Sequence, residues 1–499
     1  MNTSLPIAVL GAGPVGLAAA SRLIERGLKF VVLEAGASVG ASLQEYGHVR
    51  LFSPWRYDID HAMASMLSTT GWQAPPADEL PLAGEVVDRV LQPFASLPSV
   101  SPNLMLGTRV TSISREGFDK VKSAGREKAP FVIRAIRDGQ PIEIKASAVI
   151  DATGTWSTPN PLGANGLPAE GEREHAQQVF YGIPNVLERD RDRYAGRRTL
   201  VVGAGHSAAN ALLDLAQLAR TAPGTSLVWA TRSMAAARAF GGGDADALPA
   251  RGQLGSDLRR LRERGGLEFH GGMRIAALRP DGHGRLTVVG IGPDDKPRQI
   301  TDVDEIICAT GQRPDLTLAG ELRLKLDPWL ESTEALGPLI DPNLHSCGTV
   351  RPHGHRELSH PEPGFYTVGV KSYGRAPTFL MATGYEQVRS VVAAIAGDLE
   401  AADRVELDLP ETGVCNASAP ATAGSEQAEG CCGGPPKANA SACCALDEQK
   451  KAEGEAGCGC GTPTAEPAGE KVTTSATPAR ATSCCPPAAS PAAKPRCCG

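Results

Sequence analysis

Several features that mark membrane, secreted or nucleic-acid-binding proteins are missing from this sequence. No run of about 18 apolar residues occurs along the 499-residue chain, so no membrane-spanning helix is expected. The first residues carry no basic cluster and lead straight into an apolar stretch, which argues against a secretory signal. A net charge of -6 provides no positive surface for nucleic acid. We therefore expect a cytoplasmic protein without membrane or nucleic-acid partners.

Cysteine is nearly absent from the first four-fifths of the chain and concentrated at its end. Of 13 cysteines, only Cys308 and Cys347 precede residue 411, and residues 1–410 contain no CxxC pair. Cys308 lies in an apolar stretch and is predicted to be a buried small hydrophobe. The other 11 form a cluster that, in a reducing cytosol, indicates a soft-metal or redox element before a disulfide framework.

A glycine-rich turn near the start of the chain is its most informative motif. An apolar strand over residues 6–10 leads into the turn, and a helix over 17–26 and a second strand over 30–33 follow. The first glycine permits a tight turn, the second lets the backbone approach a pyrophosphate, and the third lets the helix pack closely. An acid after the second strand can bind ribose hydroxyls. The residues predicted to bind a dinucleotide here are Gly11, Gly13, Pro14, Gly16 and Glu34.

The same pattern recurs about two hundred residues later. A strand over 199–202, a glycine-rich turn, a helix over 209–218 and a strand over 227–230 follow one another, with Ala208 in place of the third glycine. Arg232 follows the second strand and suits the 2′-phosphate of NADPH; a solvated surface charge with NADH is the alternative. We interpret the first turn as an FAD site and this one as an NADPH site. Its predicted contacts are Gly203, Gly205, Ser207, Ala208, Thr231 and Arg232.

Two near-identical segments each end an apolar strand in Ala-Thr-Gly. They span residues 148–154 and 304–311, and the small residues would let backbone come close to a cofactor. Thr153, Gly154, Thr310 and Gly311 are therefore predicted cofactor contacts. After residue 311 the chain is expected to return to the first unit, with a strand over 363–370 and a helix over 376–396.

These patterns predict an α/β fold with two Rossmann-like dinucleotide-binding domains. The FAD-binding domain is expected to be split into residues 1–155 and 312–400, with the NAD(P)H-binding domain inserted as 156–311. Residues 411–499 contain no Phe, Trp or Tyr and are dominated by small residues and proline. Such a segment cannot bury enough apolar surface to offset its ordering entropy, so a disordered Cys-rich tail is predicted.

The chain resembles the flavin-containing monooxygenases and, more broadly, the two-dinucleotide-domain flavoprotein reductases over about residues 5–400. Both turns, Glu34, both Ala-Thr-Gly segments and residues 311–314 carry the resemblance. The monooxygenase linker motif is only partly present at residues 180–182, because its histidine is absent. The reductase aspartate that binds the ribityl chain is replaced by Val370. The resemblance implies an NADPH-dependent FAD oxidoreductase that passes oxygen to a soft sulfur, nitrogen or trivalent arsenic centre of a small molecule.

The resemblance also suggests which side chains approach the flavin. One segment follows the first unit's second strand, and the other follows the strand near residue 367. Packing on the core and ordinary loop charges are the alternatives for these residues. The candidates for the flavin and substrate pocket are His48, Arg50, Trp55, Lys371, Tyr373 and Arg375. Positive charge from the second segment would stabilise a reduced, anionic flavin. No general acid or base is predicted.

Clusters of ligand-type residues raise the question of metal binding. His345, Cys347, His353, His355 and His360 could hold a soft ion, although their spacing fits no closed zinc pattern. Vicinal thiols in the tail suit thiophilic metals or metalloids, and the chain also resembles flavoproteins associated with bacterial arsenic resistance. A metal-ion or disulfide reductase and a tail without a specific role are the alternatives. The proposed tail ligands are Cys431, Cys432, Cys443, Cys444, Cys497 and Cys498.

Overall fold

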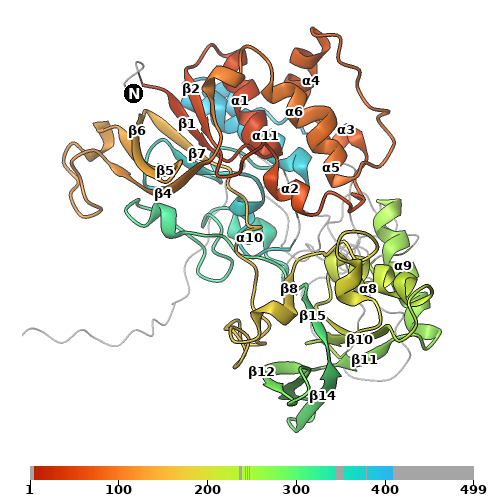
Figure 1. Ribbon diagram of the computed structural model, residues 1–499. Coiled ribbons are helices and arrows are strands. Elements are labelled where there is room, and N and C mark those ends of the chain that lie inside the picture. The colour runs from red at the N-terminus through yellow and green to blue at the C-terminus, as the bar shows by residue number, and fades with distance from the viewer. Residues whose placement is uncertain are drawn as a thin grey trace, which may run out of the picture. The chain divides into compact units, whose positions relative to one another are not determined.

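A computed structural model describes most of the chain before the cysteine-rich tail (Figure 1). The described residues are 5–407 without 235–238, 242, 244–245, 247, 344–349, 351 and 378. They form two five-stranded sheets and two three-stranded sheets. No helix in this part of the chain combines the length and apolarity that crossing a bilayer requires.

The first five-stranded sheet is parallel and has the strand order β16-β7-β1-β2-β3. Ile7 of β1 lies opposite Phe30 of β2 on one side and Ala148 of β7 on the other. The last strand comes from residues far along the chain, so the polypeptide does return to this sheet after the second glycine turn. The strands are β1 (Ile7–Leu10), β2 (Phe30–Leu33), β3 (Leu104–Met105), β7 (Ala148–Asp151) and β16 (Phe365–Thr367).

Alternate residues of β1 enter two different cores, because successive side chains of a strand point to opposite faces. Ile7 and Val9 pack with the side of the sheet that holds α1 (Pro14–Glu25) and α11 (Met381–Ile395). Ala8 and Leu10 pack with the antiparallel sheet formed by β4 (Thr108–Arg115), β5 (Phe131–Arg137) and β6 (Gln140–Ala146). The helices, the parallel sheet and the antiparallel sheet therefore form three layers, which together are called the first unit.

The second parallel sheet repeats this arrangement with the order β11-β10-β9-β15-β8. Val201 packs on the side of α8 (His206–Ala219) and α9 (Pro249–Glu263), whereas Leu200 and Val202 face the antiparallel sheet. Figure 1 shows α8 and α9 on one side of this parallel sheet and β12 and β14 on the other. The parallel strands are β8 (Val179–Tyr181), β9 (Arg198–Val202), β10 (Ser226–Thr231), β11 (Glu268–Gly271) and β15 (Glu305–Cys308). The antiparallel strands are β12 (Arg274–Pro280), β13 (Leu286–Ile291) and β14 (Pro297–Val303).

Short helices connect these layers. The α-helices are α2 (Ala41–Glu45), α3 (Trp55–Asp58), α4 (His61–Ser68), α5 (Ala83–Val86), α6 (Gln92–Ala95), α7 (Arg191–Tyr194), α10 (Gly337–Ile340) and α12 (Leu399–Asp403). A π-helical turn, η1 (Val87–Leu91), joins α5 to α6. The 3-10 turns are η2 (Ser101–Asn103), η3 (Arg126–Lys128), η4 (Ala176–Gln178), η7 (Thr317–Ala319) and η8 (Gly369–Tyr373).

Two expected elements near the end of the first unit differ from the prediction. The strand expected over 363–370 ends at Thr367, and η8 takes up the residues after it. The helix expected from residue 376 begins only at Met381. The reason is that Leu380 is extended, with φ -113° and ψ 144°, which separates the proline-containing turn from the helix.

Candidate functional site

The first glycine turn is tightly packed at both ends and open in the middle. A Cβ at Gly11, where φ is +92°, would lie 2.7 Å from the carbonyl oxygen of Ala152. A Cβ at Gly16 would lie 2.0 Å from the carbonyl oxygen of Gly11, so only glycine lets α1 pack here. Among the described residues, no heavy atom beyond the turn's own chain neighbours lies within 4 Å of a Cβ placed at Gly13. The middle of the turn therefore leaves room for a ligand to approach the backbone.

The start of α1 and the carboxylate of Glu34 complete this site. Pro14 is the first residue of α1, and no side chain caps the helix at Gly13. The N-terminal N–H groups of such a helix favour a bound anion. Glu34 accepts hydrogen bonds from the backbone N–H of Ala12 and of Gly36, each at 2.6 Å. These bonds hold its carboxylate beside the turn, and its remaining lone pairs can accept hydroxyl donors.

The second glycine turn has the same geometry. A Cβ at Gly203 would lie 2.1 Å from the carbonyl oxygen of Ala309, and one at Gly205 would have no heavy atom of the described, non-adjacent residues within 4 Å. Ala208, in the third position, is fully buried against the core, while Ser207 is half-buried in the first turn of α8. No side chain caps α8 at Gly205. The two turns thus present the same open backbone to a ligand.

His206, the first residue of α8, lies against an aromatic side chain from the first unit. Its ring centroid is 5.1 Å from that of Phe52. Burial is the main factor that lowers the pKa of His206, and the nearby Arg251 lowers it further. Phe52 precedes α3, so a segment that follows the first unit's second strand contacts the second glycine turn.

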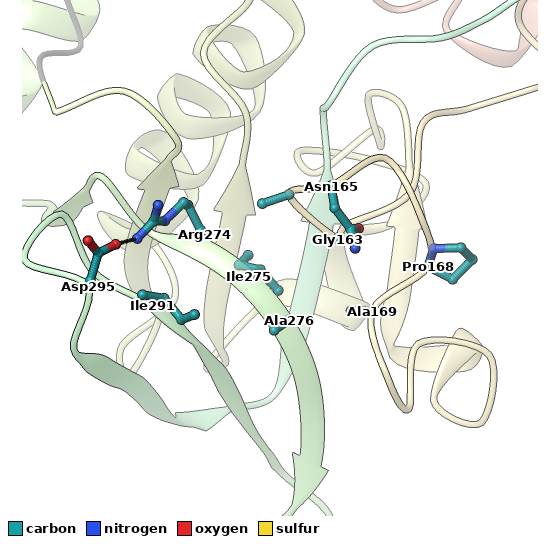
Figure 2. Close-up of a pocket in the computed structure, with 10 residues that line it drawn as sticks. Gly163, Asn165, Pro168, Ala169, Arg274, Ile275, Ala276, Ile291 and Asp295 are labelled. Atoms are coloured by element: carbon teal, nitrogen blue, oxygen red, sulfur yellow. Dashed lines mark hydrogen bonds and ion pairs between the residues drawn. The ribbon is translucent and has the colours of Figure 1, made fainter.

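The end of β10 carries the residues predicted to recognise the nucleotide phosphate. Thr231 is buried and its hydroxyl donates to the carbonyl of Ser233 at 2.8 Å. Arg232 is exposed, and its guanidinium donates to the carbonyl of Ala164 at 3.4 Å. Ala164 also lines a cavity of about 430 Å³, shown in Figure 2, in which Arg274 and Asp295 form an ion pair. Arg232 therefore contacts a residue that lines this cavity, and its charge is exposed to solvent.

The first Ala-Thr-Gly segment contributes Asp151 to a buried ion pair that the sequence did not predict. The Nζ of Lys371 is 2.7 Å from Oδ2 of Asp151 and 2.9 Å from the hydroxyl of Thr153. The side chains of Lys371 and Asp151 are each 2% exposed. The prediction of Lys371 as a net positive charge near a flavin needs correction, because Asp151 neutralises it. A charged residue that ends an otherwise apolar strand was the available signal.

Gln387 of α11 ties down the turn that carries Lys371. Its Oε1 accepts from the backbone N–H of Gly369 at 2.8 Å, and its Nε2 donates to the hydroxyl of Ser372 at 2.9 Å. That hydroxyl in turn donates to the carbonyl of Gly369 at 2.7 Å. All of these groups are buried, so the hydrogen bonds fix η8 against α11.

The second Ala-Thr-Gly segment meets the linker that enters the second unit. The hydroxyl of Thr310 donates to the carbonyl of Asn160 at 2.8 Å, and the backbone N–H of Asn160 donates to the carbonyl of Gly311 at 2.9 Å. Arg313 donates to the side chain of Asn160 at 2.8 Å. Burial raises the pKa of Cys308, which ends β15, to about 12. This thiol is therefore protonated near neutral pH, as expected for a buried hydrophobe.

Several predicted pocket residues have other partners. The side chains of Trp55 and Tyr373 are each 2% exposed and belong to the first unit's core, so their prediction as pocket residues is wrong. Arg375 forms a bidentate ion pair with Glu331, with nitrogen–oxygen distances of 2.7 and 2.9 Å.

Two other pocket candidates lie just before α3. Arg50 is exposed and donates to the carbonyl of Leu80 at 2.7 Å. His48 is half-buried, and its pKa is lowered mainly by burial and raised by a hydrogen bond with the backbone of Pro184. A contact of these two side chains with a ligand stays a prediction.

The predicted histidine cluster does not converge. Nε2 of His353 lies 2.9 Å from Nε2 of Gln387, His355 pairs with Asp403, and His360 accepts from the backbone of Lys325. Across the described part of the chain, no group of three or more His, Cys, Asp or Glu side chains could hold a metal. The remaining predicted ligands lie outside the described residues: His345, Cys347, Cys431, Cys432, Cys443, Cys444, Cys497 and Cys498.

Comparison with solved structures identifies the same fold in two kinds of enzyme. Bacillithiol disulfide reductase Bdr from Bacillus cereus matches with a TM-score of 0.57 and 18% identity, over 79% of this chain and 99% of that one. The cadaverine monooxygenase DfoA of Erwinia amylovora, solved with FAD, also gives 0.57, at 15% identity, over 81% of this chain and 96% of that one. At these identities the likeness concerns the fold alone.

Sequence comparison places the chain in a family. The probable indole-3-pyruvate monooxygenase YUCCA9 of Arabidopsis thaliana is 27% identical over 212 residues, which are 42% of this chain and 44% of that protein. The alignment thus spans less than half of that relative. Residues 5–358 match the pyridine nucleotide-disulphide oxidoreductases. The chain therefore belongs to the pyridine nucleotide-disulphide oxidoreductase family of α/β enzymes.

Proposed function

We propose that this protein is an NADPH-dependent flavoprotein oxidoreductase, with FAD at the first glycine turn and NADPH at the second. The observation that carries the proposal is the pair of open turns, each followed by an uncapped helix. The second strand of each unit is followed by a residue of opposite charge, Glu34 after β2 and Arg232 after β10. Glu34 is held beside the first turn by two backbone N–H groups and can bind ribose hydroxyls. Arg232 is exposed beyond the second turn's neighbouring strand and suits a 2′-phosphate.

We further propose monooxygenase-like chemistry on a soft sulfur, nitrogen or trivalent arsenic centre. When bound, FAD would supply hydride acceptance and oxygen chemistry, while the protein would orient the reactants and exclude water. The absence of a CxxC pair from residues 1–410 argues against reduction through an internal dithiol. The raised pKa of Cys308 supports this, because a protonated thiol is a poor nucleophile.

A second candidate is a metal-ion or disulfide reductase. The observation that favours it is the concentration of 11 cysteines after residue 410, which could deliver an oxidised substrate or a thiophilic ion to the flavin. The equal TM-scores of the disulfide reductase and the cadaverine monooxygenase leave both chemistries compatible with the fold.

The two candidates differ in their need for oxygen and for the tail. In the test, NADPH oxidation by the full-length, FAD-loaded protein is followed with arsenite or a thioether under air, and with a disulfide under nitrogen. The oxygenase proposal expects substrate to accelerate NADPH oxidation only under air, with oxygenated product formed. It also expects a full-length variant with the tail cysteines replaced by serine to retain that activity. Anaerobic turnover that disappears in the serine variant would instead establish the reductase.

A further inference from the structure

The buried ion pair of Asp151 and Lys371 joins two loops at one edge of the first parallel sheet. Asp151 ends β7, and Lys371 lies in η8, just beyond the end of β16, which is the neighbouring strand. Both side chains are 2% exposed, with 2.7 Å between Nζ and Oδ2. Because burying two charges costs much of what their attraction gains, stability alone is a weak reason for such a pair. A second consequence of the pair is that both of its charges contact one neighbouring hydroxyl group.

The hydroxyl of Thr153 is held between these two charges. It donates to Oδ1 of Asp151 at 2.7 Å and accepts from Nζ of Lys371 at 2.9 Å. A carboxylate can only accept hydrogen bonds and an ammonium can only donate them, so these directions are fixed by chemistry. The hydroxyl's single proton is thus committed to Asp151. Its remaining capacity is one lone pair, which makes it an acceptor toward any ligand.

Thr153 is the exposed member of this group and lies beside the first glycine turn. Thr153 is exposed, whereas Asp151 and Lys371 are buried. Its Cα lies 3.2 Å from the position of a Cβ on Gly11, and Asp151 is in register with Leu10 at the start of that turn. A ligand that reaches the carboxyl ends of β1 and β7 would meet this hydroxyl.

We propose that Asp151 and Lys371 are positioning residues that hold the Thr153 hydroxyl as a hydrogen-bond acceptor for a hydroxyl group of bound FAD. The inference rests on the proposed function and names one contact of that site. FAD carries ribose and ribityl hydroxyls that can donate, whereas its phosphates cannot. The neutral pair adds no net charge beside the flavin; its role is to fix the direction of one hydrogen bond.

The first test measures FAD affinity of the full-length apo-protein by titration of flavin fluorescence. Thr153→Val removes the hydroxyl and keeps the shape of the side chain. Asp151 and Lys371 stay paired with each other, so the fold should be retained. The loss of one hydrogen bond is expected to raise the Kd for FAD about 2- to 12-fold. Thr153→Ser keeps the hydroxyl and is expected to bind FAD like the wild type.

A double-mutant cycle then tests whether Lys371 acts through Thr153. Lys371→Met should raise the Kd, by no more than Thr153→Val does, because it removes the ammonium that holds one lone pair of the hydroxyl while the bond to Asp151 remains. In the Thr153→Val background, Lys371→Met should change the Kd little, whereas a general structural role would give additive losses. Lys325→Met is the control, since the Lys325 ammonium is exposed and paired with Glu334 and should not affect FAD binding.

A buried aspartate left without its partner could prevent folding of Lys371→Met. The double variant Asp151→Asn with Lys371→Gln avoids an unpaired charge and enters the same cycle. Wild-type FAD affinity in Thr153→Val, or additive losses in the cycle, would overturn the inference and leave the proposed function standing. Failure of the wild-type protein to bind FAD at all would instead refute the proposed function.

Discussion

The two glycine turns of this chain share one backbone geometry but differ in the residues around it. In both, the first glycine lies against a carbonyl oxygen just beyond the end of the neighbouring strand, and a Cβ on the second would meet none of the described, non-adjacent residues within 4 Å. The differences lie at the adjacent strand ends, where Glu34 stands in the first unit and Arg232 in the second. The backbone thus provides in each unit the geometry that the proposed pyrophosphate site requires. The charged side chains are what would distinguish one nucleotide from another.

The two Ala-Thr-Gly segments show the same contrast. In the first segment the residue before Ala-Thr-Gly is Asp151, which forms an ion pair. In the second segment that residue is Cys308, which carries a buried thiol. The Thr153 hydroxyl bonds to the ion pair, while the Thr310 hydroxyl donates to the linker carbonyl of Asn160. A repeated segment therefore carries a threonine bound to an ion pair in one unit and a threonine that connects chain segments in the other.

The largest expected effect is a loss of stability at the third glycine position, where the two turns differ in sequence. Gly16→Ala would place a Cβ 2.0 Å from the carbonyl oxygen of Gly11 and is expected to destabilise the protein by about 3 kcal/mol or more. Ala208→Gly, the reverse change in the second unit, should cost only about 1 kcal/mol, since it mainly affects helix propensity. Urea unfolding of both variants measures the difference. Similar losses in the two would show that the turns are packed alike.

Asp58 gives the first unit a dependence of stability on pH. Burial raises its pKa from 3.8 to about 7, and its Oδ2 has no hydrogen-bond partner among the described residues. The folded state therefore favours the protonated acid, so stability is highest below the unfolded pKa and falls as pH rises toward the folded pKa. The loss between pH 5 and pH 7 is expected to be about 2 kcal/mol.

Unfolding of Asp58→Asn across this pH range checks the assignment. The variant should lose most of the decline in stability, while Asp78→Asn should behave like the wild type because Asp78 is exposed and paired with Arg56. A decline that persists in Asp58→Asn would mean that another group titrates.

Arg232→Ala tests what distinguishes the second nucleotide. Removing a charge-assisted contact to a 2′-phosphate should raise KM for NADPH about 10- to 100-fold and leave KM for NADH nearly unchanged. Arg220→Ala is the control, because Arg220 is exposed at the opposite end of α8. Steady-state kinetics with both nucleotides provide the comparison. Equal changes for NADPH and NADH would remove Arg232 from the phosphate site.

Phe52→Ala should have the smallest effect. The contact of this ring with His206 is worth about 0.5–1.5 kcal/mol by comparison with other aromatic pairs. Its loss should raise KM for NADPH about 2- to 10-fold without changing FAD affinity, since only the second turn is touched. Phe52→Trp should restore the contact. A change in FAD affinity alone would show that Phe52 belongs to the first site.

The parts of the structure that were predicted from sequence depend on local pattern. The strand over 30–33 was predicted with its observed bounds, because β-strand, glycine turn and helix follow one another within a short segment. The parallel sheets followed from the repetition of that pattern. The pairing of Asp151 with Lys371 was missed because the two residues are 220 positions apart. Trp55 was misassigned since an aromatic residue after a strand suits a pocket and a core equally well.

The central claim, that the two turns hold different nucleotides, is tested most directly by a pair of valine substitutions. Gly13 and Gly205 have φ values of -78° and -98°, which any residue can adopt, and within the described ranges a Cβ at either meets no heavy atom within 4 Å apart from its chain neighbours. Each valine should therefore fold normally while filling the space over its own turn. Bound flavin and its anaerobic reduction by NADPH are measured in both full-length variants. We expect Gly13→Val to lack FAD, and Gly205→Val to retain FAD that NADPH no longer reduces. Retention of FAD by Gly13→Val, or normal reduction in Gly205→Val, would contradict the account.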